Sequence, residues 1–361
     1  MGDIYNITTK TDADLPSCDG LTNNGEIHVN GAIAAQPRIG GVVGMVGDTT
    51  VEASLNNITN SATGDLYLGM KYTKNQNVNF GGCVGRTHGS IYDVENCGDL
   101  NISGTFTKNN YNIGCVTGYT IGAKKLVNHG NLLFTGTANV GTNQSMRLTG
   151  CAAYANDETD TLEEAINYGT ISFSGETNAG LYISGVSFSS KATTNCHNKG
   201  TLSFTGKTTN DTFAMSGVAS KYTALSNCSN EGKIVCTGTT NSADIVKIGG
   251  ISYELTASIS NSYSYCDIEA IGFEGAKIGM ITASARAEGK IAQNCQVGGR
   301  IAKTESEKKT WDDDAEDYIV AVTPDWNSIS NDNFFSYIYG SVSWDGVEGY
   351  DGCTYWTGPT E

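Results

Sequence analysis

The sequence predicts an all-β protein, a parallel β-helix in which short strands stack coil upon coil. Three observations lead to this prediction. A glycine-bracketed segment recurs about every 34 residues, asparagines recur at fixed positions before it, and the 361 residues include 45 Gly and only 4 Pro. A chain rich in Gly, Asn, Ser and Thr forms helices poorly, because these residues lose more backbone entropy or compete for the helical hydrogen bonds.

The first recurring segment has the pattern of a strand with one buried face. Its second and fourth residues are apolar, as in Ile171 and Phe173, while the residues between are mostly polar. A unit of this size cannot bury its apolar face alone, so copies must stack. The nine copies begin at Gly25, Gly64, Gly98, Gly130, Gly169, Gly200, Gly232, Cys266 and Gly299.

A second apolar segment follows each copy and carries further glycines, as in the run from Gly81 to Gly85. Each repeat therefore contains at least two short strands. A propeller blade needs about 40 to 45 residues, more than the shortest repeat of 31 residues provides. We therefore predict a solenoid of about eight to nine coils, with roughly 34 residues per coil.

Two sets of asparagines recur in register with the coils. Identical polar residues in register can form side-chain ladders, in which amides hydrogen-bond from coil to coil. Asparagine also tolerates the positive φ of tight turns, and both interpretations place these residues at corners of the coil. The first set is Asn96, Asn128, Asn167, Asn198 and Asn230, and the second is Asn195, Asn227, Asn261 and Asn294.

The chain is divided by its pattern into three parts. Residues 1–24 form an N-terminal cap or a first coil, residues 25–303 the β-helix repeats, and residues 304–361 an aromatic-rich C-terminal cap that holds all 4 Trp. Aromatic side chains on a polar surface can stack on sugar rings, although packing on the last coil is the favoured interpretation here. The candidate binding residues are Tyr337, Tyr339, Trp344, Tyr350 and Trp356.

Few residues offer catalytic or metal chemistry. The acidic run Asp312, Asp313 and Asp314 could supply oxygen ligands to calcium, but it lacks the spacing of known calcium loops, and a solvated acidic loop is favoured. The 11 Cys contain no close pairs of the zinc-binding type, so we expect reduced thiols packed as small apolar residues. We expect no cofactor and no catalytic residue.

Charge and hydropathy exclude several classes of partner. The net charge of −16 disfavours nucleic acid, whose phosphates require a basic surface. No apolar run approaches the roughly 18 residues of a membrane span. No signal peptide is visible, but a chain trimmed of its export signal would look the same. We expect a monomer, and a lipid anchor on a longer precursor remains compatible with the sequence.

The repeat resembles a known family. The pattern Asn-x-Gly-x-Ile-x-Phe-x-Gly, followed by Ile-Gly-Gly, is similar to the GLUG-type repeats of secreted proteins and surface lipoproteins from gut Bacteroidales. The segment from Asn333 to Tyr339, with Trp344 and the run from Tyr350 to Cys353, resembles their C-termini. The resemblance covers residues 20–356. It implies a right-handed, adhesin-like β-helix displayed at the cell surface or secreted, with no catalytic residues to transfer.

Three functions remain open at this point. The first is a non-catalytic surface protein that binds an extracellular glycan or a host surface or matrix protein. The second is a polysaccharide lyase or glycoside hydrolase on a β-helix scaffold, which would need paired carboxylates or a calcium cluster with a basic residue. The third is a purely structural surface stalk. The absence of acidic and basic residues at stacked positions favours the first.

Overall fold

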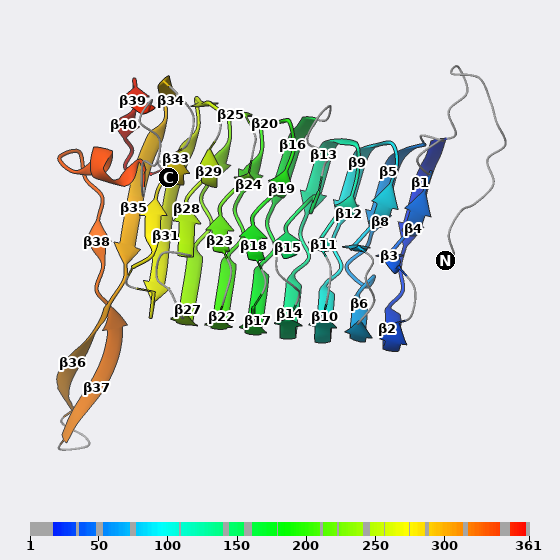
Figure 1. Cartoon of the computed structure of the whole chain (residues 1–361), viewed down its shortest axis with the longest axis horizontal. Helices are drawn as coiled ribbons and strands as arrows, with labels where there is room; N and C mark the ends of the chain where they lie inside the picture. Colours follow the sequence, from blue (N-terminus) through cyan, green and yellow to red (C-terminus); the bar gives the residue numbers. More distant parts are fainter. Residues whose placement is uncertain are drawn as a thin grey trace.

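The computed structural model describes residues 17–358, except for 34–35, 48–52, 73–76, 108–109, 140–143, 155–160, 179, 210–211, 222–223, 241–245, 256, 274, 286–288, 313–316 and 340–346. The protein is a parallel β-solenoid in which 68% of residues lie in strands. Its coils stack along the long axis of the molecule (Figure 1). The predicted parallel β-helix is therefore confirmed.

Each coil contributes up to four strands, and equivalent strands of successive coils form four rows. Row 1 contains the strand that precedes each recurring glycine: β1 (Ser17–Asn23), β5 (Ser54–Asn60), β9 (Ser90–Asn96), β13 (Gly122–Asn128), β16 (Thr161–Asn167), β20 (Ala192–Thr194) with β21 (His197–Asn198), β25 (Ala224–Ser226) with β26 (Ser229–Asn230), β30 (Ile259–Ser260) and β34 (Gly289–Gln293). Row 2 contains the recurring segment itself: β2 (Ile27–Ile33), β6 (Leu66–Tyr72), β10 (Leu100–Thr107), β14 (Leu132–Asn139), β17 (Ile171–Thr177), β22 (Leu202–Thr208), β27 (Ile234–Thr240), β31 (Tyr263–Ile271) and β35 (Gln296–Ala302).

Rows 3 and 4 are built from the second, glycine-containing segment of each repeat. Row 3 contains β3 (Arg38–Gly40), β7 (Val78–Gly81), β11 (Tyr111–Gly114), β15 (Ser145–Thr149), β18 (Gly180–Ser184), β23 (Phe213–Ser216), β28 (Val246–Gly249) and β32 (Lys277–Gly279). Row 4 contains β4 (Val43–Val46), β8 (Val84–Thr87), β12 (Thr117–Tyr119), β19 (Ser187–Ser189), β24 (Ala219–Lys221), β29 (Ser252–Leu255) and β33 (Thr282–Ala285).

The stacking is parallel and in register. The eight strands of row 3 follow one another coil by coil, which gives about 7 turns of roughly 33 residues each. This repeat length agrees with the predicted one, and eight stacked strands are separated by seven turns. In row 2, Phe173 of β17 lies beside Phe204 of β22, as the periodic pattern requires.

The core runs along the inside of the coils. The apolar residues of row 2 are buried, and the rings of Phe134, Phe173 and Phe204 form a column with centroids 4.8 and 5.6 Å apart. Each fully buried side chain of this size contributes on the order of 1.5 to 3 kcal/mol to folding. The apolar residues that alternate with polar ones in the sequence are therefore the residues of row 2 that point into the core.

The first asparagine set forms a continuous, buried ladder at the end of row 1. Each Nδ2 donates to the Oδ1 of the next asparagine at 2.7 to 2.9 Å, from Asn23 to Asn230. The same Nδ2 atoms also donate to the carbonyl of a nearby glycine, as Asn167 does to Gly169 at 2.9 Å. Two members, Asn23 and Asn60, were not predicted.

The second asparagine set is a column of turns. Asn195, Asn227, Asn261 and Asn294 all have left-handed backbones, with φ between 48° and 54°, and all are exposed. Among the described residues of this column, one amide-to-amide bond is present, from Asn294 to Asn261 at 3.5 Å. The turn interpretation describes this set as a whole, because positive φ is the feature that all four residues share.

The glycines follow from the close approach of successive coils. Gly206 has a φ of 150°, and a Cβ added there would overlap the carbonyl oxygen of Gly175 in the coil below. A Cβ on Gly185, in the turn between rows 3 and 4, would overlap the Cγ of Asn198. The glycine turn therefore packs directly against the asparagine ladder across the interior of the coil.

The C-terminal segment departs from the coil pattern. Strands β36 (Glu305–Asp312) and β37 (Asp317–Pro324) form an antiparallel hairpin that extends away from the stack (Figure 1). The chain then returns through β38 (Asn327–Ser328) and the 3-10 helix η2 (Phe334–Tyr337). Finally, β39 (Val347–Asp351) and β40 (Thr354–Tyr355) pair in parallel with β34 and β35 and so cover the last rung of row 1 and part of row 2.

We predict that Asn167→Ala lowers the free energy of unfolding by about 3 kcal/mol or more, because it removes three hydrogen bonds and leaves buried amide groups of its neighbours unpaired. Urea unfolding followed by circular dichroism measures the change. The matched control is Asn195→Gly in the exposed turn column, where glycine suits the positive φ, and a change within about 0.5 kcal/mol is expected. Equal losses in the two variants would show that the ladder contributes nothing special.

Candidate functional site

The predicted aromatic residues of the C-terminus mainly pack against the end of the solenoid. Tyr337 and Tyr339 are partly buried against the core, and the Tyr339 hydroxyl accepts a hydrogen bond from the backbone nitrogen of Ala292 at 3.1 Å. Trp356 packs edge-on against Tyr263, with ring centroids 4.5 Å apart. Tyr350 is 38% exposed, and Trp344 lies outside the described residues. Among the four of these residues that the structure describes, only Tyr350 is exposed, and the other three are half-buried.

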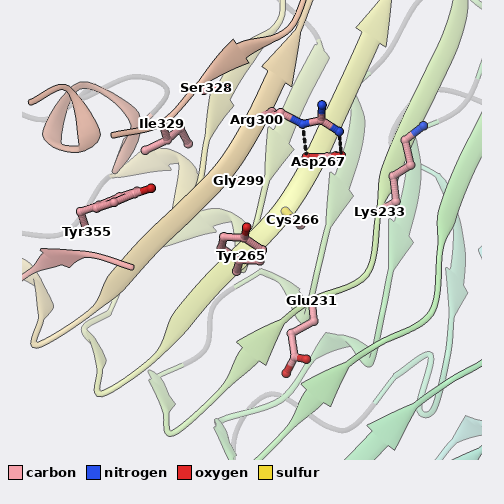
Figure 2. Close-up of a pocket in the computed structure, with 10 residues that line it drawn as sticks. All are labelled: Glu231, Lys233, Tyr265, Cys266, Asp267, Gly299, Arg300, Ser328, Ile329 and Tyr355. Atoms are coloured by element: carbon pink, nitrogen blue, oxygen red, sulfur yellow. Dashed lines mark hydrogen bonds and ion pairs between the residues drawn. The ribbon is translucent and has the colours of Figure 1, made fainter. Parts of the chain in front are cut away.

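An open cleft of about 500 Å³ lies on the outer face of row 2, beside the returning C-terminal chain. Its lining residues come from β31 and β35, from the turn before β27, and from the C-terminal strands: Glu231, Lys233, Tyr265, Cys266, Asp267, Gly299, Arg300, Ser328, Ile329 and Tyr355. Figure 2 shows Tyr355 and Lys233 on opposite sides of the cleft, with Arg300 and Asp267 between them. We call this surface the C-terminal cleft.

A row of three charged side chains crosses the cleft from coil to coil. Lys233 precedes β27, and Asp267 and Arg300 pair directly in β31 and β35. The Arg300 guanidinium binds the Asp267 carboxylate through two bonds, of 3.1 Å from Nε and 2.5 Å from Nη2. This hydrogen bonding raises the pKa of Arg300. The fork-shaped pair fixes both groups in one plane.

Trp326 lies over this charged row. Its ring centroid is 4.6 Å from the Arg300 guanidinium carbon and 5.7 Å from the Lys233 ammonium, within the range of cation–π attraction. Lys233 also forms an ion pair with Glu269 at 2.9 Å. The tryptophan therefore holds the segment after the β36–β37 hairpin against row 2, next to the cleft.

The cleft combines aromatic faces with hydrogen-bonding groups of both charges. Tyr265 and Tyr355 are partly exposed, and the Glu231 carboxylate accepts a hydrogen bond from the Tyr263 hydroxyl at 2.8 Å. Such a surface can stack an apolar ring face while carboxylate and guanidinium groups bind hydroxyls at its edge.

Within the described part of the chain, no group of three or more His, Cys, Asp or Glu side chains could hold a metal ion. Of the predicted calcium candidates, Asp313 and Asp314 lie outside the described residues, as does the side chain of Asp312. The calcium prediction therefore stays a prediction.

The cysteines occupy stacked interior positions, as their spacing predicts. Cys83, Cys115 and Cys151 follow the glycine turns and are fully buried, and burial raises the pKa of each of these thiols well above its ordinary value. Among the ten cysteines whose side chains are described, none forms a disulfide. Two are partly exposed, Cys97 and Cys353.

Several residues of the cleft were not predicted from sequence. The sequence places Trp326 only within the aromatic-rich C-terminal cap. Lys233, Asp267 and Arg300 belong to three different repeats. The signal that could have identified the charged residues is the register of the repeat, because Asp267 and Arg300 each follow the anchors Cys266 and Gly299 by one residue, as Lys233 follows Gly232. Trp326 packs over Arg300 and Lys233 because the returning chain places it there, and this part of the chain lies outside the repeats.

No protein-family model, no curated protein and no solved structure matches this chain. No described helix is long and apolar enough to cross a membrane.

We predict that Cys353 is the first described cysteine to be alkylated in the native protein. It is partly exposed, and a hydrogen bond with Cys295 lowers the pKa of its thiol, whereas Cys228, whose pKa a hydrogen bond with Cys196 also lowers, is buried. Cys97 should follow more slowly, because burial raises its pKa. Iodoacetamide labelling between pH 7 and pH 9, read by mass spectrometry in a Cys18→Ser background, tests this order. Early labelling of Cys83, Cys115 or Cys151 would contradict it.

Proposed function

We propose that this chain is a non-catalytic β-helix protein, displayed at the cell surface or secreted, that acts in adhesion by binding a glycan or a host matrix protein. The observation that carries the proposal is the C-terminal cleft, where Tyr265 and Tyr355 stand beside the Asp267–Arg300 pair. Aromatic faces next to planar hydrogen-bonding groups match the alternating apolar and hydroxylated surfaces of sugars.

The bonding of the two cleft carboxylates favours binding over hydrolysis. Glu231 accepts from the Tyr263 hydroxyl, and Asp267 is held by Arg300. A glycosidase needs one carboxylic acid and one carboxylate placed on either side of the scissile bond. Carboxylates that are already engaged serve better to orient hydroxyl groups of a ligand.

A stalk without a ligand would not require this arrangement. The outer positions of β17 and β22, in the regular part of row 2, carry mostly small polar residues, such as Ser172, Ser174 and Ser203. The cleft instead gathers aromatic and charged residues from three coils and from the returning chain. This concentration supports a local binding site rather than a uniform spacer.

We predict that Tyr355→Ala weakens ligand binding by about tenfold or more, which corresponds to about 1.4 kcal/mol, because it removes one aromatic wall of the cleft. The measurement begins with an array of pectins, host glycosaminoglycans, bacterial polysaccharides and matrix proteins, and continues by titration of the strongest probe. The matched control is Tyr168→Ala, which removes a tyrosine that is 44% exposed and lies outside the cleft.

Three outcomes would count against the proposal. The array gives no signal, the two variants bind equally well, or incubation with the polysaccharides yields shortened chains. The first favours a structural stalk, the second a binding site elsewhere on the molecule, and the third an enzyme.

A further inference from the structure

A second cavity, of about 210 Å³, lies between rows 3 and 4 in the N-terminal half of the solenoid. It is lined by two arginines, two tyrosines and four asparagines: Arg86, Arg147, Tyr119, Tyr154, Asn77, Asn79, Asn110 and Asn112. None of the described lining residues is Asp or Glu, although the chain as a whole has a net charge of −16. The cavity therefore concentrates positive charge in an acidic protein.

Two columns of side chains face each other across this cavity. In row 3, Asn79, Asn112 and Arg147 occupy equivalent positions of β7, β11 and β15. They are linked in series, because Arg147 Nη1 donates to Asn112 Oδ1 at 2.8 Å and Asn112 Nδ2 donates to Asn79 Oδ1 at 3.0 Å. Asn79 and Asn112 are 2% and 4% exposed. This wall is rigid and held in place by its own hydrogen bonds.

The opposite wall, in row 4 and the turn that continues it, is an aromatic and cationic stack. The Arg86 guanidinium carbon lies 4.9 Å from the ring centroid of Tyr119, and the Tyr119 ring stacks on Tyr154 at 5.5 Å. Arg147 reaches across from row 3 to within 5.1 Å of the Tyr154 ring. These cation–π contacts orient both guanidinium groups, but the contact with Tyr119 does not satisfy the hydrogen-bond donors of Arg86.

The charge of Arg86 is incompletely compensated within the described part of the chain. Its Nε is buried and has no hydrogen-bond partner there. Burial lowers the pKa of Arg86, and the nearby positive charge of Arg38 lowers it further. Arg86 is half-buried, and a guanidinium that is partly removed from water gains from a carboxylate, sulfate or phosphate partner. A bound anionic group would supply that partner.

We propose that this cavity binds an acidic polysaccharide, with a carboxylate or sulfate group of the ligand on Arg86 and Arg147. The asparagine amides and tyrosine hydroxyls around the two guanidinium groups suit the hydroxyls of the same sugar. The site is separate from the C-terminal cleft, and it adds a ligand class to the proposed function.

The two arginines lie along the solenoid axis, in coils two steps apart. Arg86 pairs with Tyr119 of the next coil in row 4, and Tyr111 of that coil pairs with Met146, the residue before Arg147. Both guanidinium groups contact the intervening coil, because Arg86 lies over the Tyr119 ring and Arg147 Nη1 donates to Asn112. One acidic group of a sugar placed at that coil can therefore face both cations.

The test uses ligands that differ only in charge. Oligogalacturonate hexamer carries a carboxylate on each ring, and its methyl-esterified form has the same backbone without the charge. A sulfated galactan oligosaccharide and its desulfated form distinguish sulfate from carboxylate recognition. Isothermal titration at low salt and at physiological salt measures the affinity of the full chain for each probe.

We predict that the wild-type chain binds at least one of the two charged probes, that the affinity falls as salt rises, and that removal of the charge from the probe abolishes binding. Arg86→Gln should weaken binding about 10- to 100-fold, because it removes a charge-assisted bond. Lys199→Gln, at an exposed lysine outside the cavity, is the matched control and should bind as the wild type does.

A second variant keeps the test decisive if Arg86→Gln fails to fold. Asn112→Asp has nearly the same shape and keeps the acceptor for Arg147, although it loses the bond to Asn79. It places a negative charge in the cavity, so it should abolish binding of the acidic probes. Absence of binding to both charged probes at low salt, equal binding of charged and uncharged forms, or equal affinities of Arg86→Gln and Lys199→Gln would overturn the proposal. Tyr355→Ala in the same titration separates this site from the C-terminal cleft, because only a shared site would make it lose the acidic probes.

Discussion

The fold depends on one interaction, the hydrogen-bonded column of asparagine amides that runs through the coils from Asn23 to Asn230. An amide that donates to the coil above and accepts from the coil below fixes the register of row 1, since a slip of one residue would leave the whole column buried and unpaired. The ladder also requires glycine in the turns between rows 3 and 4, which face it across the interior of the coil. Gly150, Gly185 and Gly217 lie so close to ladder asparagines that any side chain there would displace them. The two sequence motifs of each repeat are therefore two halves of one packing arrangement.

The ladder ends where the candidate binding surface begins. The next coil places Ser264 opposite Asn230, and the Asn230 Nδ2 is buried without a hydrogen-bond partner in the described part of the chain. Glu231 and Lys233 follow directly and line the C-terminal cleft. A regular stack presents the same residue types on every rung, so it offers no unique position for a ligand. Beyond the last ladder asparagine, the outer positions of β31 and β35 no longer carry the residue types of the earlier coils. The returning chain adds Tyr355 and Trp326 beside them.

Much of this architecture could be predicted from the sequence, because periodic burial and periodic glycines follow directly from stacking. The limits lie in particular residues. Asn60 precedes Gly64 by four residues rather than two, since an extra turn intervenes, and a rule of fixed spacing misses it. Asn195 and its equivalents recur as regularly as the ladder, yet periodicity cannot distinguish a turn that needs positive φ from a column of bonded amides. The cleft and the arginine cavity escaped prediction because each combines residues of separate rows or of the returning chain, which the periodicity of a single segment does not bring together.

The net charge of the whole chain and the two charges inside the arginine cavity act on a ligand at different distances. At physiological ionic strength, charges further apart than about 8 Å are largely screened from one another. The overall charge of −16 therefore keeps copies of the chain apart and slows the approach of any polyanion, but it does not set the potential inside a small cavity. There the nearest charges dominate, and these are Arg86 and Arg147. An acidic chain can thus hold an acidic ligand, provided that the ligand enters between rows 3 and 4, and its selectivity then arises from the spacing of those two cations rather than from the sign of the surface.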